Sequence, residues 1–127
     1  MQDKHLYEYA VIRVVPRVER EEFINAGIIL FCKRQKFIKM LYTVDEVKLA
    51  VLDAELDTEQ LRKNLESFEK IAHGSKDGGP IAQMETAERF RWLTAVRSSV
   101  IQTSRPHPGF CDHPEKKANQ LFTELVL

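Results

Sequence analysis

The chain has 127 residues, which is enough for one domain and too few for two ordinary ones. Its 19 basic residues balance its 19 acidic residues, and this zero net charge argues against a protein that coats nucleic acid. Hydrophobic residues make up 43% of the chain, so it should fold, and no apolar run approaches the roughly 20 residues that cross a bilayer. The two cysteines are too few for a disulfide framework, and the charged start shows no secretory signal. We therefore expect a reduced, cytoplasmic protein without a membrane partner.

Three strands are predicted in the first third of the chain. Residues 6–15 are rich in β-branched and aromatic types and stop at Pro16, which has no amide hydrogen for a ladder. Residues 23–32 form the most apolar stretch, which is typical of a central strand covered on both faces. A short polar turn separates that stretch from residues 37–43, so we expect an antiparallel hairpin.

Helical periodicity begins after the third predicted strand. Asp45 suits the N-cap of a short helix that runs through Leu52. Asp57 or Thr58 suits the N-cap of a longer helix that Gly74 stops. Strands that cluster first, with helices following, indicate an α+β fold.

The second half of the chain adds two more helices and one short strand. We predict a helix over 85–97, a strand over 100–103 and a last helix from Pro114 onward. Residues 105–109 hold two prolines and a glycine, which predicts irregular structure. The expected fold is a single α+β domain over 1–127, with an antiparallel sheet of three or four strands packed by about four helices.

Arg89 falls in the middle of the apolar arc of the predicted helix 85–97. A buried guanidinium is costly unless a carboxylate or another anion meets it. Two interpretations stay open. Glu85, one turn earlier, pairs with Arg89 inside the fold, or Arg89 binds an anionic ligand.

The first predicted strand places Tyr7, Tyr9, Val11 and Arg13 on one face. Two tyrosines and an arginine on one face could clamp a planar or phosphorylated ligand. The alternative is a half-exposed sheet face on which these side chains pack laterally.

The segment 98–107 is dense in hydroxyl groups and has an arginine near each end. Hydroxyls, loop amides and guanidinium groups are the groups that bind phosphate or carboxylate. With the arginines of the first strand and the third helix, they define a candidate anion site. Its residues are Arg13, Arg89, Arg97, Ser99, Gln102 and Arg105.

The histidines and cysteine near the last helix show no recognised catalytic or metal-binding spacing. His107, Cys111, Asp112 and His113 lie close in sequence, but no CxxC or HxxxH motif accompanies them. No nucleophile or zinc-hydrolase motif occurs either. We expect no catalytic residue, no metal and no cofactor.

Three stretches carry a family resemblance: YEYAVIRVVPR over 7–17, EFINAGIILFC over 22–32 and RFRWLTAVRSSVIQTSRPHPG over 89–109. With them, the chain resembles a bacterial family catalogued as domain of unknown function 3037. The resemblance implies a small bacterial, cytoplasmic protein. It also implies a HipA-type kinase as a neighbour, and so a role as an accessory subunit.

The resemblance singles out Arg13, Glu22, Asn25 and Gly27. These residues either form one hydrogen-bonded network that fixes the hairpin, or they line a site. In the network, the Glu22 carboxylate offsets Arg13, and Asn25 satisfies amides that a bulge at Gly27 leaves free.

Two functions follow from these patterns. The leading hypothesis is a non-enzymatic binding or accessory protein that acts through protein contacts, with a protein partner or with copies of itself. The segment 45–69 has three basic and eight acidic residues. Its negative charge either forms a solvated face or complements a basic patch on a partner. The alternative is a binder or enzyme for a phosphate-bearing small molecule or a nucleic-acid end that uses the arginine cluster.

Overall fold

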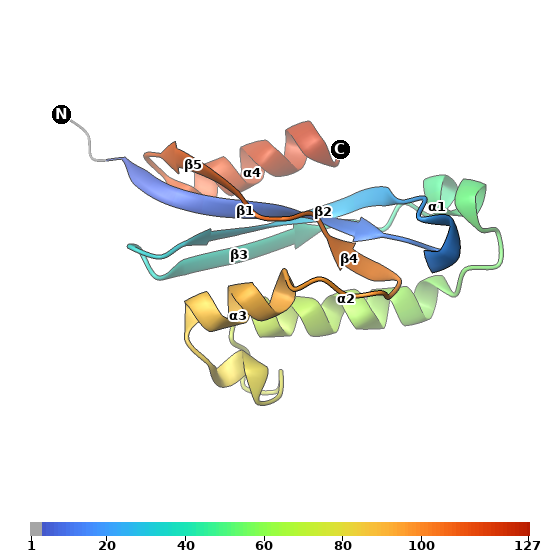
Figure 1. Cartoon of the computed structure of the whole chain (residues 1–127), viewed down its shortest axis with the longest axis horizontal. Coiled ribbons are helices and arrows are strands. Elements are labelled where there is room, and N and C mark those ends of the chain that lie inside the picture. The colour runs from blue at the N-terminus through green and yellow to red at the C-terminus, as the bar shows by residue number, and fades with distance from the viewer. Residues whose placement is uncertain (1–3) are drawn as a thin grey trace.

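The computed structural model describes residues 4–127 and shows an α+β fold, as predicted. Its antiparallel sheet has five strands: β1 (His5–Val14), β2 (Ile24–Cys32), β3 (Phe37–Tyr42), β4 (Ile101–Thr103) and β5 (His107–Cys111). Its helices are α1 (Glu46–Leu52), α2 (Thr58–Ala72), α3 (Thr86–Leu93) and α4 (Pro114–Leu125), with short 3-10 turns η1 (Val18–Arg20) and η2 (Ile81–Gln83). Figure 1 shows α4 on one side of the sheet and α2 with α3 on the other. No helix within residues 4–127 is long and apolar enough to cross a bilayer.

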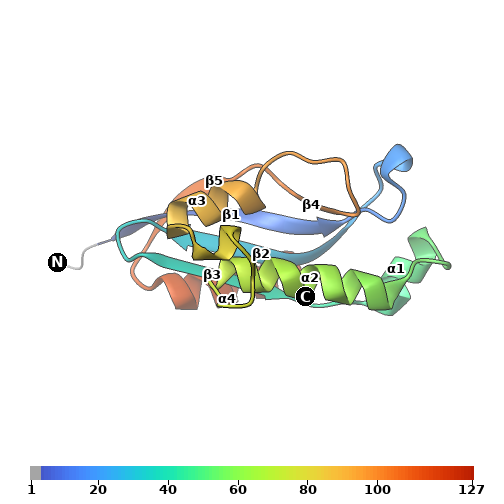
Figure 2. The ribbon, with the colours of Figure 1, turned by 90° about the horizontal axis from the view of Figure 1, so that it is seen from below.

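Alternation along β1 builds the two cores. Ala10, Ile12 and Val14 belong to the core that α2 and α3 cover, where the rings of Phe31 and Phe90 stack at 5.1 Å. Residues of the opposite parity turn to α4 and form the second core. Figure 2, seen from below, shows α2 and α3 in front of the sheet.

The outer edge of β1 is shared by two strands. β4 pairs with Ile12–Val14, and β5 pairs with His5–Tyr9. Ser104 joins them, because its N–H donates to the Val11 carbonyl and its Oγ accepts from the Val11 N–H, both at 2.8 Å. The prediction of irregular structure over 105–109 holds for residues 105–106 but was wrong for 107–109, so the sheet has five strands where three or four were expected. β5 lies at the sheet edge, where a proline can turn its nitrogen outward without removing a ladder hydrogen bond.

The start of β2 contains a bulge. Ile12 pairs with Gly27, but Arg13 pairs with Asn25, so Ala26 is the additional residue. A Cβ at Gly27 would collide with the Leu41 carbonyl and lie 2.9 Å from the Cβ of Tyr42. Gly27 is thus needed for the close approach of β3.

The helix limits agree with the predicted caps except in α3. Asp45 and Asp57 accept hydrogen bonds from the third residue beyond them, as N-caps do. α3 stops at Leu93 and does not reach residue 97. Two carbonyls of its last turn are satisfied by side chains: the Thr94 hydroxyl donates to the Phe90 carbonyl and the Arg97 guanidinium donates to the Trp92 carbonyl.

Candidate functional site

Arg89 is a structural residue. It is only 9% exposed, and its Nη1 donates to the Ala72 carbonyl at the end of α2, at 3.4 Å. Gly74 follows with φ 65°, and a Cβ there would lie 3.1 Å from the Arg89 Cζ and closer still to Nη1. The predicted pairing with Glu85 was wrong: Glu85 is exposed at the start of α3, and no ion pair joins the two within residues 4–127. Arg89 thus lies away from the cavity that Arg13 and Arg97 line, and its Nε is buried without a hydrogen-bond partner among the described residues.

Arg13 meets a different environment at the end of β1. Its guanidinium carbon lies 4.3 Å from the centroid of the Phe23 ring, and its Nε is buried without a hydrogen-bond partner. Within the described residues, no carboxylate lies within 4 Å of it. The side chain borders a cavity of about 540 Å³, here named the Arg13 hollow. The hollow is also lined by Val18, Glu21, Phe23, Val96, Arg97 and Gln102.

Arg97 lines the same hollow, but its guanidinium is directed to two rings. Its Cζ lies 4.6 Å from the Trp92 ring centroid and 5.0 Å from that of Phe68. Burial lowers the pKa of Arg97. Arg97 thus holds the aromatic side chains of α2 and α3 together, and its own charge has no carboxylate partner among residues 4–127.

A second cavity, of about 490 Å³, adjoins the Arg13 hollow at Val18. We name it the Trp92 groove, and its apolar wall comprises Phe68, Ile71, Trp92, Val100 and Ile101. The segment 96–101 divides between the two: residues 96–98 line the hollow and residues 99–101 line the groove. The hollow, the groove and this segment together form the 96–102 face.

The predicted anion site is therefore only partly assembled. Arg13, Arg97 and Gln102 share the Arg13 hollow, and Ser99 lies in the neighbouring groove. Gln102 and Ser99 already donate hydrogen bonds within the chain. Gln102 Nε2 donates to the Ser99 carbonyl at 2.9 Å, and Ser99 Oγ donates to the Ile101 carbonyl at 2.7 Å. Arg105 lies at the bend between β4 and β5, outside both cavities.

The predicted network of Arg13, Glu22, Asn25 and Gly27 does not form. Glu22 pairs with Arg20 at 2.6 Å, and this hydrogen bond lowers the pKa of the Glu22 carboxyl. Asn25 Nδ2 instead donates to the Leu125 carbonyl at 3.1 Å, which ties the last turn of α4 to the bulge. The offset of Arg13 by Glu22 was thus a wrong prediction, because the η1 turn places Arg20 beside that carboxylate.

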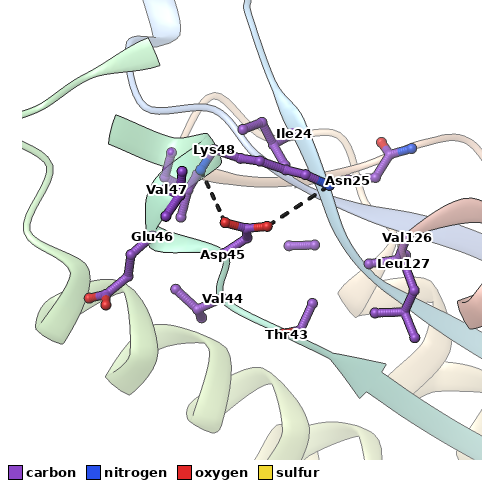
Figure 3. A pocket seen from close by; sticks show the side chains of 12 residues that line it. Ile24, Asn25, Thr43, Val44, Asp45, Glu46, Val47, Lys48, Val126 and Leu127 are labelled. Carbon is purple, nitrogen blue, oxygen red and sulfur yellow. Dashed lines mark hydrogen bonds and ion pairs between the residues drawn. The ribbon is translucent and has the colours of Figure 1, made fainter. Parts of the chain in front are cut away.

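Asn25 also lines a third cavity, of about 540 Å³, between β2, α1 and the end of the chain (Figure 3). Its walls are mostly aliphatic, from Ile24, Val44 and Val126 among others. Its charged groups engage each other: Asp45 accepts from the Lys48 N–H at 3.1 Å, and its second oxygen lies 4.0 Å from Lys48 Nζ. This cavity offers a ligand fewer free charges than the Arg13 hollow.

The tyrosines of β1 pack within the fold. Tyr7 is buried against Gly109, and burial followed by the neighbouring Cys111 raises its pKa. Tyr9 lies 5.4 Å from His107, ring centroid to ring centroid. Both rings pack laterally, but the half-exposed face that we weighed against a ligand clamp describes Tyr9 alone, because Tyr7 is buried in the second core.

The cluster near α4 shows no metal-binding arrangement. Over residues 4–127, no group of three or more His, Cys, Asp or Glu side chains is placed to hold a metal ion. Cys111 is buried, and this burial raises the pKa of its thiol, so the thiol stays protonated near neutral pH.

Sequence reasoning missed the aromatic partners of the arginines. Val14 pairs with Ile24, so the next residues outward, Val15 and Phe23, lie opposite each other where the β1–β2 connection begins. The register of this hairpin would therefore have placed Phe23 near Arg13. Phe68 and Trp92 come together through the packing of α2 on α3, for which no local signal exists.

Comparison with known proteins gives one match. No curated protein and no solved structure matches the chain. A family model does, over residues 9–126, and its description is "Protein of unknown function (DUF3037)". This match includes the 96–102 face and nearly the whole sheet. The chain belongs to the DUF3037 family.

Proposed function

We propose that the protein is a non-enzymatic binding or accessory protein that contacts another protein through the 96–102 face. One observation carries the proposal: Val96 is fully exposed on a segment that separates two cavities. Phe23, 46% exposed, borders one of them, and Trp92, 39% exposed, borders the other. Exposed apolar groups gathered beside hollows are typical of protein-binding surfaces.

The composition of this face supports contact with a protein. Aromatic residues and arginine are enriched at protein interfaces, whereas lysine and glutamate are depleted. The face combines three aromatic residues with Arg13 and Arg97, and its one acidic lining residue is Glu21. The eight acidic residues of the segment 45–69 line neither cavity, and they provide solubility around the face.

The alternative function is a site for an anionic small molecule or a nucleic-acid end. The observation in its favour is that Arg13 has no carboxylate partner among the described residues. Against it, Arg89 is used inside the fold, and Arg97 is held between two rings. Of these three arginines, Arg13 thus remains to bind the ligand. Phosphate sites, in contrast, commonly combine several donors.

The family resemblance identifies the partner to test first. A HipA-type kinase would bind this chain as an accessory subunit, and a second copy of the chain is the next candidate. Such an arrangement belongs in the cytoplasm of a bacterium, where we place the protein.

Photo-crosslinking tests the proposal. We would introduce benzoylphenylalanine at Val96 and, as a matched control, at Asn119, an exposed residue of α4 on the opposite face of the sheet. Irradiation in native cells should give one stoichiometric adduct from position 96, identified by mass spectrometry, and none from position 119. Equal yields at both positions, or no adduct at either, would contradict the proposal.

A further inference from the structure

The Arg13 hollow contains a cation that the chain itself leaves unneutralised. Two nearby arginines have carboxylates, since Arg20 pairs with Glu22 at 2.6 Å and Arg17 lies 4.0 Å from Asp53. Arg97, which also lines the hollow, has the rings of Trp92 and Phe68 in place of a carboxylate. Arg13 is half-buried, yet it has only the face of Phe23. A partly desolvated guanidinium gains most from a carboxylate that accepts two parallel hydrogen bonds.

The surroundings of Arg13 favour a single negative charge over a polyanion. Glu21 lines the hollow, and Glu19 and Glu22 flank it in the same connection. The Glu22 carboxylate is paired with Arg20, but those of Glu19 and Glu21 would repel a dianionic phosphate or a nucleic-acid backbone more strongly than a single carboxylate. Part of the wall is apolar, from Val15, Val18 and Phe23, and it suits the carbon atoms of an Asp or Glu side chain. The rest of the lining includes Arg97, whose guanidinium lies over the rings of Trp92 and Phe68, and the polar residues Ser98 and Gln102.

The Trp92 groove suits an aliphatic side chain. Its apolar wall comprises Phe68, Ile71, Trp92, Val100 and Ile101, beside the polar residues Asn64, Ser67 and Ser99. Arg97 already lies over the rings of Phe68 and Trp92. Those rings are therefore engaged by a cation, and the space left in the groove is apolar. Because the groove adjoins the hollow at Val18, neighbouring residues of one short segment reach both cavities.

We infer that the 96–102 face binds a protein segment in which an Asp or Glu lies beside aliphatic residues. The carboxylate pairs with Arg13, and an aliphatic side chain fills the Trp92 groove. This inference rests on the proposed function and specifies the chemistry of the partner.

Fluorescence of Trp92 gives a direct assay, because Trp92 is the single tryptophan of the chain. The probe is an acetylated and amidated peptide, Gly-Ser-Leu-Glu-Leu-Glu-Leu-Ser-Gly, and the matched peptide has glutamine for both glutamates. We expect saturable binding of the glutamate peptide at least about tenfold tighter than that of the glutamine peptide, with a difference that shrinks in high salt.

Two variants test the role of Arg13. Arg13→Gln should abolish the preference for glutamate, and Arg13→Lys should keep part of it, since lysine retains the charge but not the planar fork. Arg105→Gln, which removes an equal charge outside both cavities, should bind as the wild type does. Circular dichroism would check that each variant is folded.

The results separate this inference from the proposed function. Equal binding of both peptides, no saturable binding at millimolar peptide, or an unchanged preference in Arg13→Gln would overturn the inference. So would Arg13-dependent binding of an oligodeoxythymidine or of inorganic phosphate without binding of the glutamate peptide. A position-96 crosslink that survives any of these results would leave the proposed function standing and reject only the acidic partner.

Discussion

Arg89 and Arg13 both extend from apolar elements, but the fold treats them differently. Arg89 lies against Gly74 and donates to the Ala72 carbonyl, so its counterpart belongs to the same chain. Arg13 lies on Phe23 at the edge of an open hollow, without a carboxylate within 4 Å in the described part of the chain. Neither arginine has a carboxylate within 4 Å among residues 4–127, and the Nε of each is buried without a hydrogen-bond partner. The two therefore differ in whether the guanidinium is enclosed by the chain or borders an open hollow.

The largest expected effect is on stability, and it belongs to Arg89. Arg89→Ala removes a buried side chain and leaves the Ala72 carbonyl without its donor, so we expect a loss of about 2–4 kcal/mol in the free energy of unfolding. Arg13→Ala removes a ring contact at the surface and should cost about 1 kcal/mol or less. Urea denaturation measures both. Equal losses of unfolding free energy in Arg89→Ala and Arg13→Ala would contradict the different roles given to the two arginines.

Gly74 sharpens the same comparison. Gly74→Ala places a Cβ at φ 65° and against the Arg89 guanidinium, so it should cost about 1–3 kcal/mol. Gly79→Ala is the matched control, because Gly79 has φ 86° but open space around it, and it should cost about 1 kcal/mol. In the Arg89→Ala background, the cost of Gly74→Ala should fall toward that of the control, with a remainder from the Ala82 carbonyl 3.3 Å from the new Cβ. A cost that does not change would show that Gly74 and Arg89 act independently.

A smaller effect is expected from His73, beside Arg89. Its Nε2 accepts from the Met40 N–H at 3.3 Å, and burial lowers its pKa, helped by nearby Lys39 and Arg89 against the opposing effect of Glu69. Below about pH 6.5, the ordinary histidine value, the unfolded chain therefore takes up a proton more readily than the folded chain. The free energy of unfolding should fall as the pH drops from that value.

Denaturation at a series of pH values would test this expectation. His73→Gln should flatten the decrease, and Arg89→Gln should reduce it, because one cation near His73 is removed. Arg13→Gln should leave the decrease unchanged. Stability that rises on acidification, with His73 present, would show that the charged imidazole is the favoured form in the fold.

Much of the fold follows from local patterns. The capping aspartates, the apolar stretch of β2 and the bulge beside Gly27 all have local signals, and the structure confirms them. β5 has none, because its pairing with β1 depends on Ser104, which lies 93 residues from Val11. The last turn of α3 likewise has a partner from beyond the helix, because the Arg97 guanidinium donates to the Trp92 carbonyl.

The candidate site was predictable only in part. Arg13 stands out in the sequence because it shares a strand face with apolar and aromatic residues, and the structure places it at a hollow. The carboxylates expected to neutralise Arg13 and Arg89 were predicted wrongly. Glu22 and Glu85 had suitable spacing, but local turns and caps direct them elsewhere. Sequence spacing predicts which charges are unusual, whereas tertiary packing decides what neutralises them.

The most direct test of the account is the yield of the position-96 crosslink in the Arg13→Gln background, compared with the wild type. If a partner supplies the counterpart of Arg13, the yield should fall at least about tenfold while circular dichroism shows an unchanged fold. An undiminished yield of the same adduct would show that the partner binds this face without Arg13, and would contradict the central claim.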